Sequence, residues 1–395
     1  MKILVINSGS QSLKFQIIDA ETEVENASGQ IERIGIDGIL TYKKDGNKTE
    51  ENVDAPNHVK ALELILGVLT SQERGVISSL DEIQACGHRV GHGGAEFNKS
   101  VIVDDEVLKK IESLTDLAPL HMPANIMGIK ACMDVMPGVP QVAVFDTAFH
   151  QTIPPKAYLY AIPIKYYKEL GVRKYGFHGT SFSYVLEKVC ELQGLDINNS
   201  KVIICHIGSG ASVGAFLNGK SIDTTMGMTP LEGLVMGTRS GDIDPGIFEY
   251  ICQKENLSVE EFTKILNKES GMLGLSGISN DNRDLLEEEA KGNEDAKNAL
   301  DAYIYRIQKY VGAFYMALGG VDVIALCGGA GENNLTMRGR MVESFGALGI
   351  KLDEAKNTEP GVAKVLSTDD SKIPVWTIPT NEELKIARET HELVK

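Results

Sequence analysis

Residues 2–19 read KILVINSGSQSLKFQIID, and this stretch decides the fold. Its apolar run at residues 3–6 is short and continuous, which is typical of a buried strand. Small polar residues interrupt the run at 7–10. From Leu13 onward apolar and polar residues alternate, with the period of a strand that has one solvated face. The pattern predicts two strands joined by a Gly/Ser turn.

A second stretch of the same kind, VIICHIGSGASVGAFL, occupies residues 202–217. The two stretches align, with Ser12 opposite Ser212. One supersecondary unit repeated in each half of a chain indicates duplication. We therefore expect two duplicated α/β domains, an N-terminal one over 1–150 and a C-terminal one over 151–380.

The remaining segments predict alternating strands and helices. Apolar runs that end in polar or Gly-rich residues predict strands within 83–94, 142–150 and 321–334. Helical apolar spacing predicts helices at 58–70 and 304–318. The tail 381–395 is a predicted helix, with Asn381 as a candidate N-cap, that joins the N-terminal domain. The polar stretch 43–57 is predicted to be a loop. This alternation is typical of the α/β class.

The composition excludes several classes of function. The 395 residues carry 39 Lys and Arg against 55 Asp and Glu, a net charge of −16, so neither nucleic acid nor an anionic membrane surface is an expected partner. No apolar run approaches the ~18–20 residues of a membrane span. The six cysteines include no C-x-x-C pair, which favours free thiols over disulfides or a zinc site. We expect a cytoplasmic protein, in which local basic residues can still bind small anions.

The two Gly/Ser turns are candidate phosphate cradles. Small residues let backbone N–H groups approach an anion, and hydroxyl groups add donors. Lys14 places a cation near the first turn. A plain β-turn is the better explanation of a single hairpin of this kind. Two such hairpins, together with a third Gly-rich turn at 328–331, favour phosphate binding.

Four further side chains are candidates because of their sequence setting. Arg89 and Arg239 both lie among glycines, and a guanidinium suits a carboxylate or a phosphate, although a surface ion pair is the commoner role. His178 is either a satisfied core histidine or a ligand contact. Asp146 ends an apolar strand, where an acid often faces a ligand cleft in open α/β sheets, and a helix N-cap is the alternative.

These stretches together resemble the acetate kinase family. The resemblance covers residues 3–391 and rests on the segments INSGSQSLKFQ, GHRVGHGG, LAPLHMPAN, VFDTAFH, YGFHGTSF, HIGSGAS, DTTMGMTPLEGLVMGTRSGDIDPG, GISNDNRDL, CGGAGEN and IPTNEELKIARET. It implies the actin, sugar-kinase and heat-shock-chaperone fold, with two duplicated ribonuclease H-like domains and ATP in the cleft between them. It also implies a homodimer. The implied reaction is reversible phosphoryl transfer from ATP to acetate or another short-chain carboxylate, with Mg²⁺ or Mn²⁺ as the cofactor.

The resemblance also implies roles for individual residues. It implies that the catalytic residues are Asp146, His178 and Arg239. It implies that Arg89 binds the carboxylate of the substrate, beside an acyl pocket lined by Gly91, Leu120, Phe177 and Pro230. It implies that the metal is bound by Asn7 and Glu382. Around the nucleotide it places Ser10, Ser12, Lys14, His206, Ile207, Gly208, Ser209, Gly210, Asp281, Asn282, Arg283, Gly329, Ala330, Gly331, Glu332 and Asn333.

The chemistry agrees with these roles. A carboxylate acceptor is already deprotonated at neutral pH, so the transfer needs charge neutralisation rather than a general base. Two arginines and a metal ion supply that charge, and His178 supplies a hydrogen bond. Asp146 is then better interpreted as an orienting group for an arginine or the metal than as a proton acceptor.

Two departures from the family pattern bear on the substrate and on the nucleotide. Gly91 stands where acetate kinases usually carry Val, which predicts a larger acyl pocket and a propionate kinase as the alternative, unless neighbouring side chains fill the gap. Ser209 replaces a usual Asn in the second turn and could weaken a phosphate contact. Two other hypotheses are a nucleotide-binding protein without activity and a sugar kinase. The first needs no carboxylate clamp, and the second needs a catalytic base.

Overall fold

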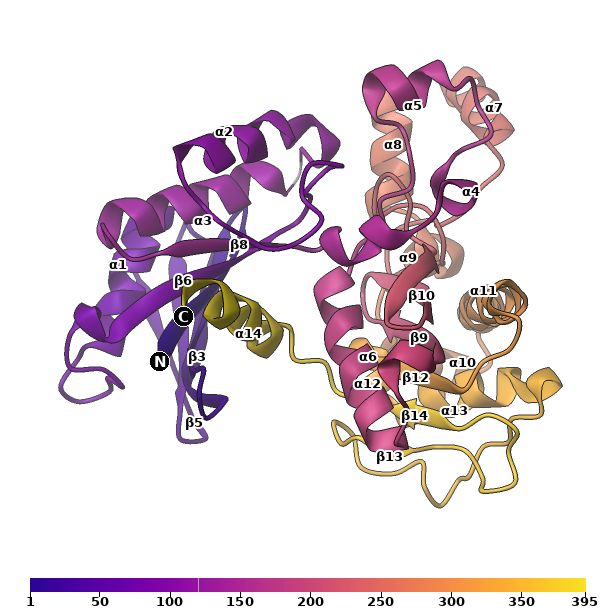
Figure 1. The fold of residues 1–395 in the computed structure, drawn as a ribbon. Helices are drawn as coiled ribbons and strands as arrows, with labels where there is room; N and C mark the ends of the chain where they lie inside the picture. The colour runs from indigo at the N-terminus through magenta and orange to yellow at the C-terminus, as the bar shows by residue number, and fades with distance from the viewer. Residues whose placement is uncertain (120) are drawn as a thin grey trace. The chain divides into compact units, whose positions relative to one another are not determined.

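The computed structural model describes residues 1–119 and 121–395. The chain divides into two compact units, Met1–Phe149 together with Asn381–Lys395, and His150–Thr380. Each unit has its own sheet, its own helices and its own hydrophobic core (Figure 1).

The first unit is built on an eight-stranded sheet with the strand order β5-β4-β3-β2-β1-β6-β8-β7. Its strands are β1 (Lys2–Gly9), β2 (Ser12–Asp19), β3 (Val24–Glu32), β4 (Gly38–Lys44), β5 (Asn47–Val53), β6 (Ile83–Val90), β7 (Val101–Ile102) and β8 (Gln141–Phe145). The predicted hairpin is confirmed, because β1 and β2 pair antiparallel. The strands β1, β6 and β8 run parallel, so their carboxyl ends lie at one edge of the sheet.

Helices cover both faces of this sheet (Figure 1). They are α1 (His58–Leu69), α2 (Asp105–Ser113), α3 (Met122–Val135) and α14 (Glu382–Val394), with 3₁₀ turns at Leu80–Glu82 and Thr115–Leu117. A further 3₁₀ turn, Ala148–Thr152, spans the point where the chain passes from the first unit into the second. The helix α3 packs against α1, β1 and β6, and α14 packs against β1, β6 and β8. The predicted tail helix is confirmed. Its N-cap is Asn381, whose side chain accepts a hydrogen bond from the N–H of Leu384 at 3.0 Å.

The prediction of a loop at 43–57 is wrong, because this stretch contains the outermost strand β5. The strands β4 and β5 meet at Asp45 and Gly46, which both have positive φ, 50° and 77°. This is the geometry that Asp-Gly favours in a two-residue hairpin turn. Six of the seven β5 side chains are exposed, so no apolar alternation marks the strand. Charged side chains on such an edge oppose pairing with other chains.

The second unit has a six-stranded sheet with the order β11-β10-β9-β12-β14-β13. Its strands are β9 (Lys201–Ile207), β10 (Ala211–Leu217), β11 (Lys220–Thr224), β12 (Val323–Cys327), β13 (Lys364–Val365) and β14 (Val375–Thr377). As in the first unit, an antiparallel hairpin (β9–β10) is followed by two strands parallel to its first member (β12, β14) and by one antiparallel edge strand. Duplication predicts this shared order.

The described part of the second unit also contains twelve helical segments. They are α4 (Pro155–Tyr158), α5 (Lys165–Leu170), α6 (Gly179–Gln193), α7 (Gly246–Glu255), α8 (Val259–Lys268), α9 (Gly271–Ser276), α10 (Asn282–Ala290), α11 (Glu294–Leu318), α12 (Gly328–Asn333), α13 (Leu335–Ser344) and the 3₁₀ turns Ile197–Asn199 and Gly346–Leu348. The predicted helix 304–318 is confirmed as the second part of α11, which packs against α9, α10 and β10. The α/β class is therefore confirmed in both units.

The cysteines are free thiols, as predicted, and five of the six are buried. Their burial disfavours the thiolate, and the pKa of Cys205 is raised above its usual range for this reason. None of the helices in the described ranges combines the length and the apolar character that crossing a membrane requires.

Candidate functional site

In the first unit, the predicted site residues meet where the parallel strands end. Arg89 is the penultimate residue of β6, and Asp146 follows β8 directly. The N–H of Asp146 donates to the carbonyl of Val90 at 2.9 Å, which fixes Asp146 beside the end of β6. Glu382 is the first residue of α14. We call Asn7, Arg89, Asp146 and Glu382 the Arg89 cluster.

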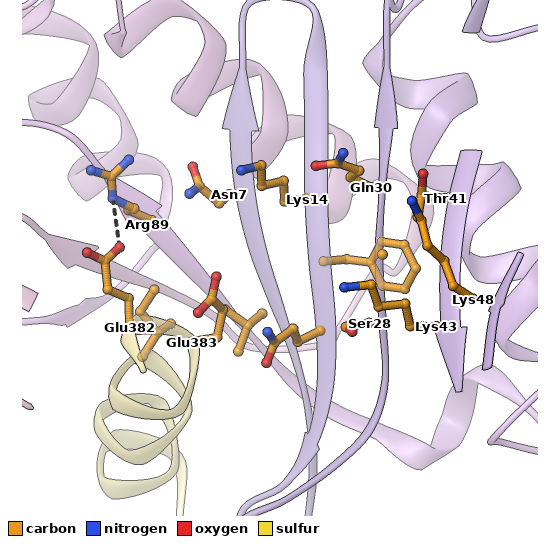
Figure 2. A pocket seen from close by; sticks show the side chains of 15 residues that line it. Asn7, Lys14, Ser28, Gln30, Thr41, Lys43, Lys48, Arg89, Glu382 and Glu383 are labelled. Carbon is orange, nitrogen blue, oxygen red and sulfur yellow. Dashed lines mark ion pairs between the residues drawn. The ribbon is translucent and has the colours of Figure 1, made fainter. Parts of the chain in front are cut away.

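An ion-pair network holds the Arg89 guanidinium. Its Nη2 hydrogen-bonds Oδ2 of Asp146, and its Nε lies 3.3 Å from Asp146 Oδ1. The same Nε lies 3.8 Å from Glu382 Oε2, an ion pair that Figure 2 marks with a dashed line. Asp146 is 2% exposed. The carboxylate of Asp146, which has the largest effect, and that of Glu382 raise the pKa of Arg89 above its already high range. Nη1 has no partner among the described residues, so a charged, oriented donor is left for an anion.

A groove of about 240 Å³ runs from this cluster across the sheet (Figure 2). The strand register pairs Asn7 with Lys14 and Lys14 with Gln30, so the three side chains form one row along its floor. Lys14 is exposed. Of the two other predicted phosphate-turn residues, Ser10 is exposed in the turn between β1 and β2, and Ser12 begins β2.

Asn7 and Glu382 are suited to a cation that arrives with its substrate. Both line the groove, and each offers a hard oxygen donor. In the described ranges no group of three or more His, Cys, Asp or Glu side chains could hold a metal ion. Mg²⁺ commonly binds through one or two protein ligands, with waters and substrate phosphates completing its shell. The donor set therefore fits Mg²⁺ brought in with a nucleotide, and does not form an all-protein cage.

A buried amide holds the backbone at Gly91. The Gly91 N–H donates to Asn125 Oδ1 at 2.9 Å, and Asn125 Nδ2 donates to the carbonyl of Ser8 at 2.8 Å. A Cβ added at Gly91 would lie 3.5 Å from Asn125 Oδ1 and from His121 Cβ, which is ordinary contact distance. The position therefore has room for a Cβ atom. Leu120, predicted to line the same acyl pocket, lies outside the described residues.

In the second unit, the predicted transition-state residues also come together. His178 precedes α6 with a positive φ of 58°, and its Nδ1 lies 2.9 Å from Ser212 Oγ. Its ring stacks on the ring of His206, with centroids 4.2 Å apart. A Cβ added at Gly210 would lie 3.3 Å from Arg239 Nη1 and 3.8 Å from His178 Nε2. We call His178, His206, Ser212 and Arg239 the Arg239 cluster.

Arg239 is half-buried without a carboxylate partner in the described chain. Its Nη1 contacts the carbonyl oxygen of Pro230 at 3.3 Å and Sδ of Met236 at 3.8 Å. Burial lowers the pKa of Arg239, because no negative charge compensates for the lost solvation. An uncompensated buried charge is costly, so this guanidinium is set to receive an anion. Phe177, the other acyl-pocket residue of this unit, is buried, and its carbonyl contacts Nε2 of His150.

A cavity of about 730 Å³ lies beside the second Gly/Ser turn. Among the residues that line it, the sequence predicted Gly208, Ser209, Asp281, Asn282, Arg283, Gly329, Ala330 and Asn333. The sequence did not predict Met272, Asn280, Leu286, Asn334 and Leu335. Asn280 is adjacent to the predicted trio, and Leu286 lies one helical turn beyond Asn282, so helix periodicity could have pointed to it.

Other predicted nucleotide residues do not line this cavity. Gly331 and Glu332 support the turn instead: Glu332 Oε1 accepts hydrogen bonds from the N–H groups of Gly328 and Thr380, at 2.7 and 2.9 Å, and the Gly331 carbonyl accepts from Thr377 Oγ1. The other members of that set in the second unit border the turn: His206 and Ile207 end β9, and Gly210 directly precedes β10. Sequence reasoning missed Ser212 and Asn125 as partners of site residues, since no local pattern marks them.

Comparisons with known proteins show the family to which this chain is similar. A family model described as the acetokinase family matches residues 2–388. The acetate kinase of Lachnoclostridium phytofermentans is 55% identical over the whole of both chains, and that of Helicobacter hepaticus is 53% identical over all of this chain and 99% of its own. The solved acetate kinase of Porphyromonas gingivalis is 44% identical with a TM-score of 0.96, over 100% of both chains. A solved propionate kinase of Francisella tularensis is 40% identical with a TM-score of 0.93, over 99% of both. The chain belongs to the acetokinase family.

Proposed function

We propose that this protein is an acetate kinase, which transfers the γ-phosphoryl group of ATP reversibly to acetate, giving acetyl phosphate and ADP. The observation that carries the proposal is the pair of half-buried guanidinium groups, each with an unpaired or weakly bonded Nη1, inside a full-length match to the acetokinase family. Two separately held guanidinium groups suit a reaction in which one anion must approach another.

Arg89 is the proposed carboxylate-binding group. Its Nε and Nη2 are engaged by Asp146, so the planar fork cannot rotate away. The Nη1 donor is left to bind a carboxylate oxygen of the acceptor. Asp146 then acts as a positioning residue for Arg89. No base is needed, since the acceptor carries its negative charge before it reacts.

Arg239 and His178 are the proposed groups that stabilise the phosphoryl group in transfer. In this step a carboxylate oxygen forms a bond to the γ-phosphorus while the bond from that phosphorus to the bridging oxygen of ADP breaks. Charge develops on the equatorial oxygens and on the leaving oxygen. The donors Arg239 Nη1 and His178 Nε2, both close to Gly210, are placed to stabilise it.

The nucleotide is proposed to occupy the cavity beside Gly208–Ser209, with its phosphates on the backbone N–H groups of this turn. Lys14 is a separate proposed phosphate contact on the first unit. Asn7 and Glu382 would hold Mg²⁺. When bound, the ion neutralises phosphate oxygens of ATP.

Propionate is the alternative acceptor, and the space at Gly91 favours it. A Cβ added at this position would meet its neighbours at ordinary contact distance, and in the proposed acyl pocket the absence of a Val side chain would leave volume for the extra methylene of propionate. The two candidate functions share every charged group and differ in the acyl pocket alone.

A hydroxamate assay tests the proposal. Acyl phosphate is trapped with hydroxylamine in mixtures of protein, ATP, Mg²⁺ and acetate, propionate, butyrate or a sugar. The proposal expects acyl hydroxamate with short acids and no ADP release with the sugar. Arg89→Ala should raise KM for acetate steeply. Arg33→Ala, a matched control at an exposed arginine paired with Asp37 in the same unit, should leave it unchanged. ATP binding without product would favour a non-catalytic binder.

We also propose that two copies of the chain form a homodimer through the second unit. Large apolar side chains are exposed on and beside α5, at Ile162 and Leu170, and around α7 and α8, at Tyr250 and Val259. These helices lie at the same end of the unit (Figure 1). Exposed apolar side chains gathered in this way are typical of subunit contacts. Light scattering should give twice the chain mass for the wild type, and Leu170→Glu with Tyr250→Glu should shift it to the monomer.

A further inference from the structure

The hydroxyl group of Ser212 has a single polar contact in the described chain. Ser212 lies on β10 opposite His206 and is fully buried, with 0% of its surface exposed. Its Oγ lies 2.9 Å from His178 Nδ1. A serine hydroxyl has one hydrogen to donate and lone pairs to accept with, so the direction of this hydrogen bond can be inferred.

The buried setting selects one direction. If Nδ1–H donated to Ser212 Oγ, the hydroxyl hydrogen would have no acceptor among the described residues. An unsatisfied buried donor is costly, whereas donation from Oγ to an unprotonated Nδ1 satisfies it. In a neutral imidazole the proton then resides on Nε2, because the hydrogen bond made by one ring nitrogen fixes the state of the other.

Nε2 is the nitrogen on the side of the second Gly/Ser turn. A Cβ added at Gly210 would lie 3.8 Å from His178 Nε2 and 3.3 Å from Arg239 Nη1, so both atoms border the same backbone position. The stacking of the His178 ring on the His206 ring limits rotation of the His178 side chain. His178 thus presents a fixed N–H beside the guanidinium.

We propose that Ser212 is a positioning residue that fixes His178 as an Nε2–H donor for the transferred phosphoryl group. The proposal rests on the phosphoryl-transfer function proposed for this protein. Ser212 does not itself contact substrate. It holds the tautomer and the ring orientation that the hydrogen bond to an equatorial phosphoryl oxygen requires, so that no tautomer change accompanies transfer.

Replacement of Ser212 tests the role by its kinetic signature. Ser212→Ala should lower kcat about 10- to 100-fold, the usual effect of losing a partner that orients a functional histidine. KM for acetate and for ATP should stay within about twofold, because the binding groups are untouched. Ser367→Ala is the matched control. Ser367 is a serine of the same unit that is 1% exposed, and its Oγ accepts from the Val375 N–H. This control should lose comparable thermal stability and keep kcat.

A double-mutant cycle separates positioning from packing. His178→Gln keeps an uncharged N–H donor near the Nε2 position but has no second ring nitrogen for Ser212 to hold. In this background Ser212→Ala should change kcat less than about twofold. An equal loss in both backgrounds, or no loss in either, would overturn the proposal.

Nitrogen-15 NMR of the imidazole rings gives a readout that does not depend on turnover. The His178 signals, assigned by their absence in His178→Gln, should report the Nε2–H tautomer in the wild type and a mixture in Ser212→Ala. An Nδ1–H tautomer in the wild type contradicts the proposal even if the enzyme is active. Absence of acyl phosphate with the wild type would instead refute the proposed function and leave the tautomer result standing.

Discussion

Replacement of Gly91 by valine tests how the acyl pocket chooses its substrate. The backbone tolerates the change, because the φ of Gly91 is not in the left-handed region and a new Cβ meets Asn125 Oδ1 and His121 Cβ at 3.5 Å. The variant should therefore fold with a melting temperature close to that of the wild type. In the proposed acyl pocket, the added isopropyl group would take the space that the methylene of propionate uses.

The magnitude follows from the size of one methylene group. Burial of one CH₂ contributes about 0.8 kcal/mol, so its loss alone lowers the propionate-to-acetate ratio of kcat/KM by about fourfold. Steric overlap with the valine branch adds to this loss, and hydrophobic pockets discriminate one methylene by about 10- to 200-fold in total. We expect the ratio to fall at least about tenfold in Gly91→Val and by a smaller factor in Gly91→Ala.

The assay is the hydroxamate reaction with acetate, propionate and butyrate, each titrated through its KM. The Gly91→Ala variant grades the effect, since it adds a single carbon. An unchanged ratio in a valine variant that retains full acetate activity would refute the reasoning. It would mean either that neighbouring side chains already fill the space or that position 91 does not face the acyl group.

Three further predictions concern charge, pH and the nucleotide turn. Arg239→Ala should lower kcat about 10²- to 10³-fold and leave the melting temperature unchanged or raised, because it removes an uncompensated buried charge; a large drop in melting temperature would contradict this. Burial lowers the pKa of His88 from its usual 6.5 to about 4. Between these two pH values the unfolded state binds more protons than the folded state. The free energy of unfolding therefore decreases as pH falls from about 6.5 to about 4, by about 3 kcal/mol in total. Urea unfolding across this range should show a flatter pH dependence for His88→Asn, and equal slopes would refute the assignment. Glu332→Ala should raise KM for ATP about tenfold with KM for acetate unchanged, because its carboxylate holds the Gly328 N–H; an unchanged KM for ATP would refute that role.

The two hairpins were predictable because their signals are local. A continuous apolar run, a turn of small residues and an alternating strand lie within about twenty residues at 2–19 and again at 202–217. Because β1 and β9 are buried on both faces, successive side chains along each strand are apolar, and this produces the continuous apolar run. The same physics explains the failure at 47–53. An exposed edge strand needs no apolar side chains, so the Asp45-Gly46 turn is the local feature that marks this hairpin.

The convergence of Arg89 and Asp146 was predictable in outline. Parallel strands bring their carboxyl ends to one edge, so polar residues at those ends meet. The sequence did not reveal which groups pair. Ser212 reaches His178 from another element, and Asn125 joins Gly91 to Ser8 from a helix. These contacts depend on the direction of side chains in the folded chain, and no spacing in the sequence encodes that direction.

The central claim is transfer of phosphate to a carboxylate, and one measurement tests it most directly. Purified protein is incubated with ATP, Mg²⁺ and acetate, propionate or butyrate, and acyl phosphate is trapped as the hydroxamate. We predict acyl hydroxamate that requires protein, ATP, Mg²⁺ and acid together and falls about 10²- to 10³-fold in Arg239→Ala. No hydroxamate from any of the three acids, with the protein folded and ATP bound, would contradict the account.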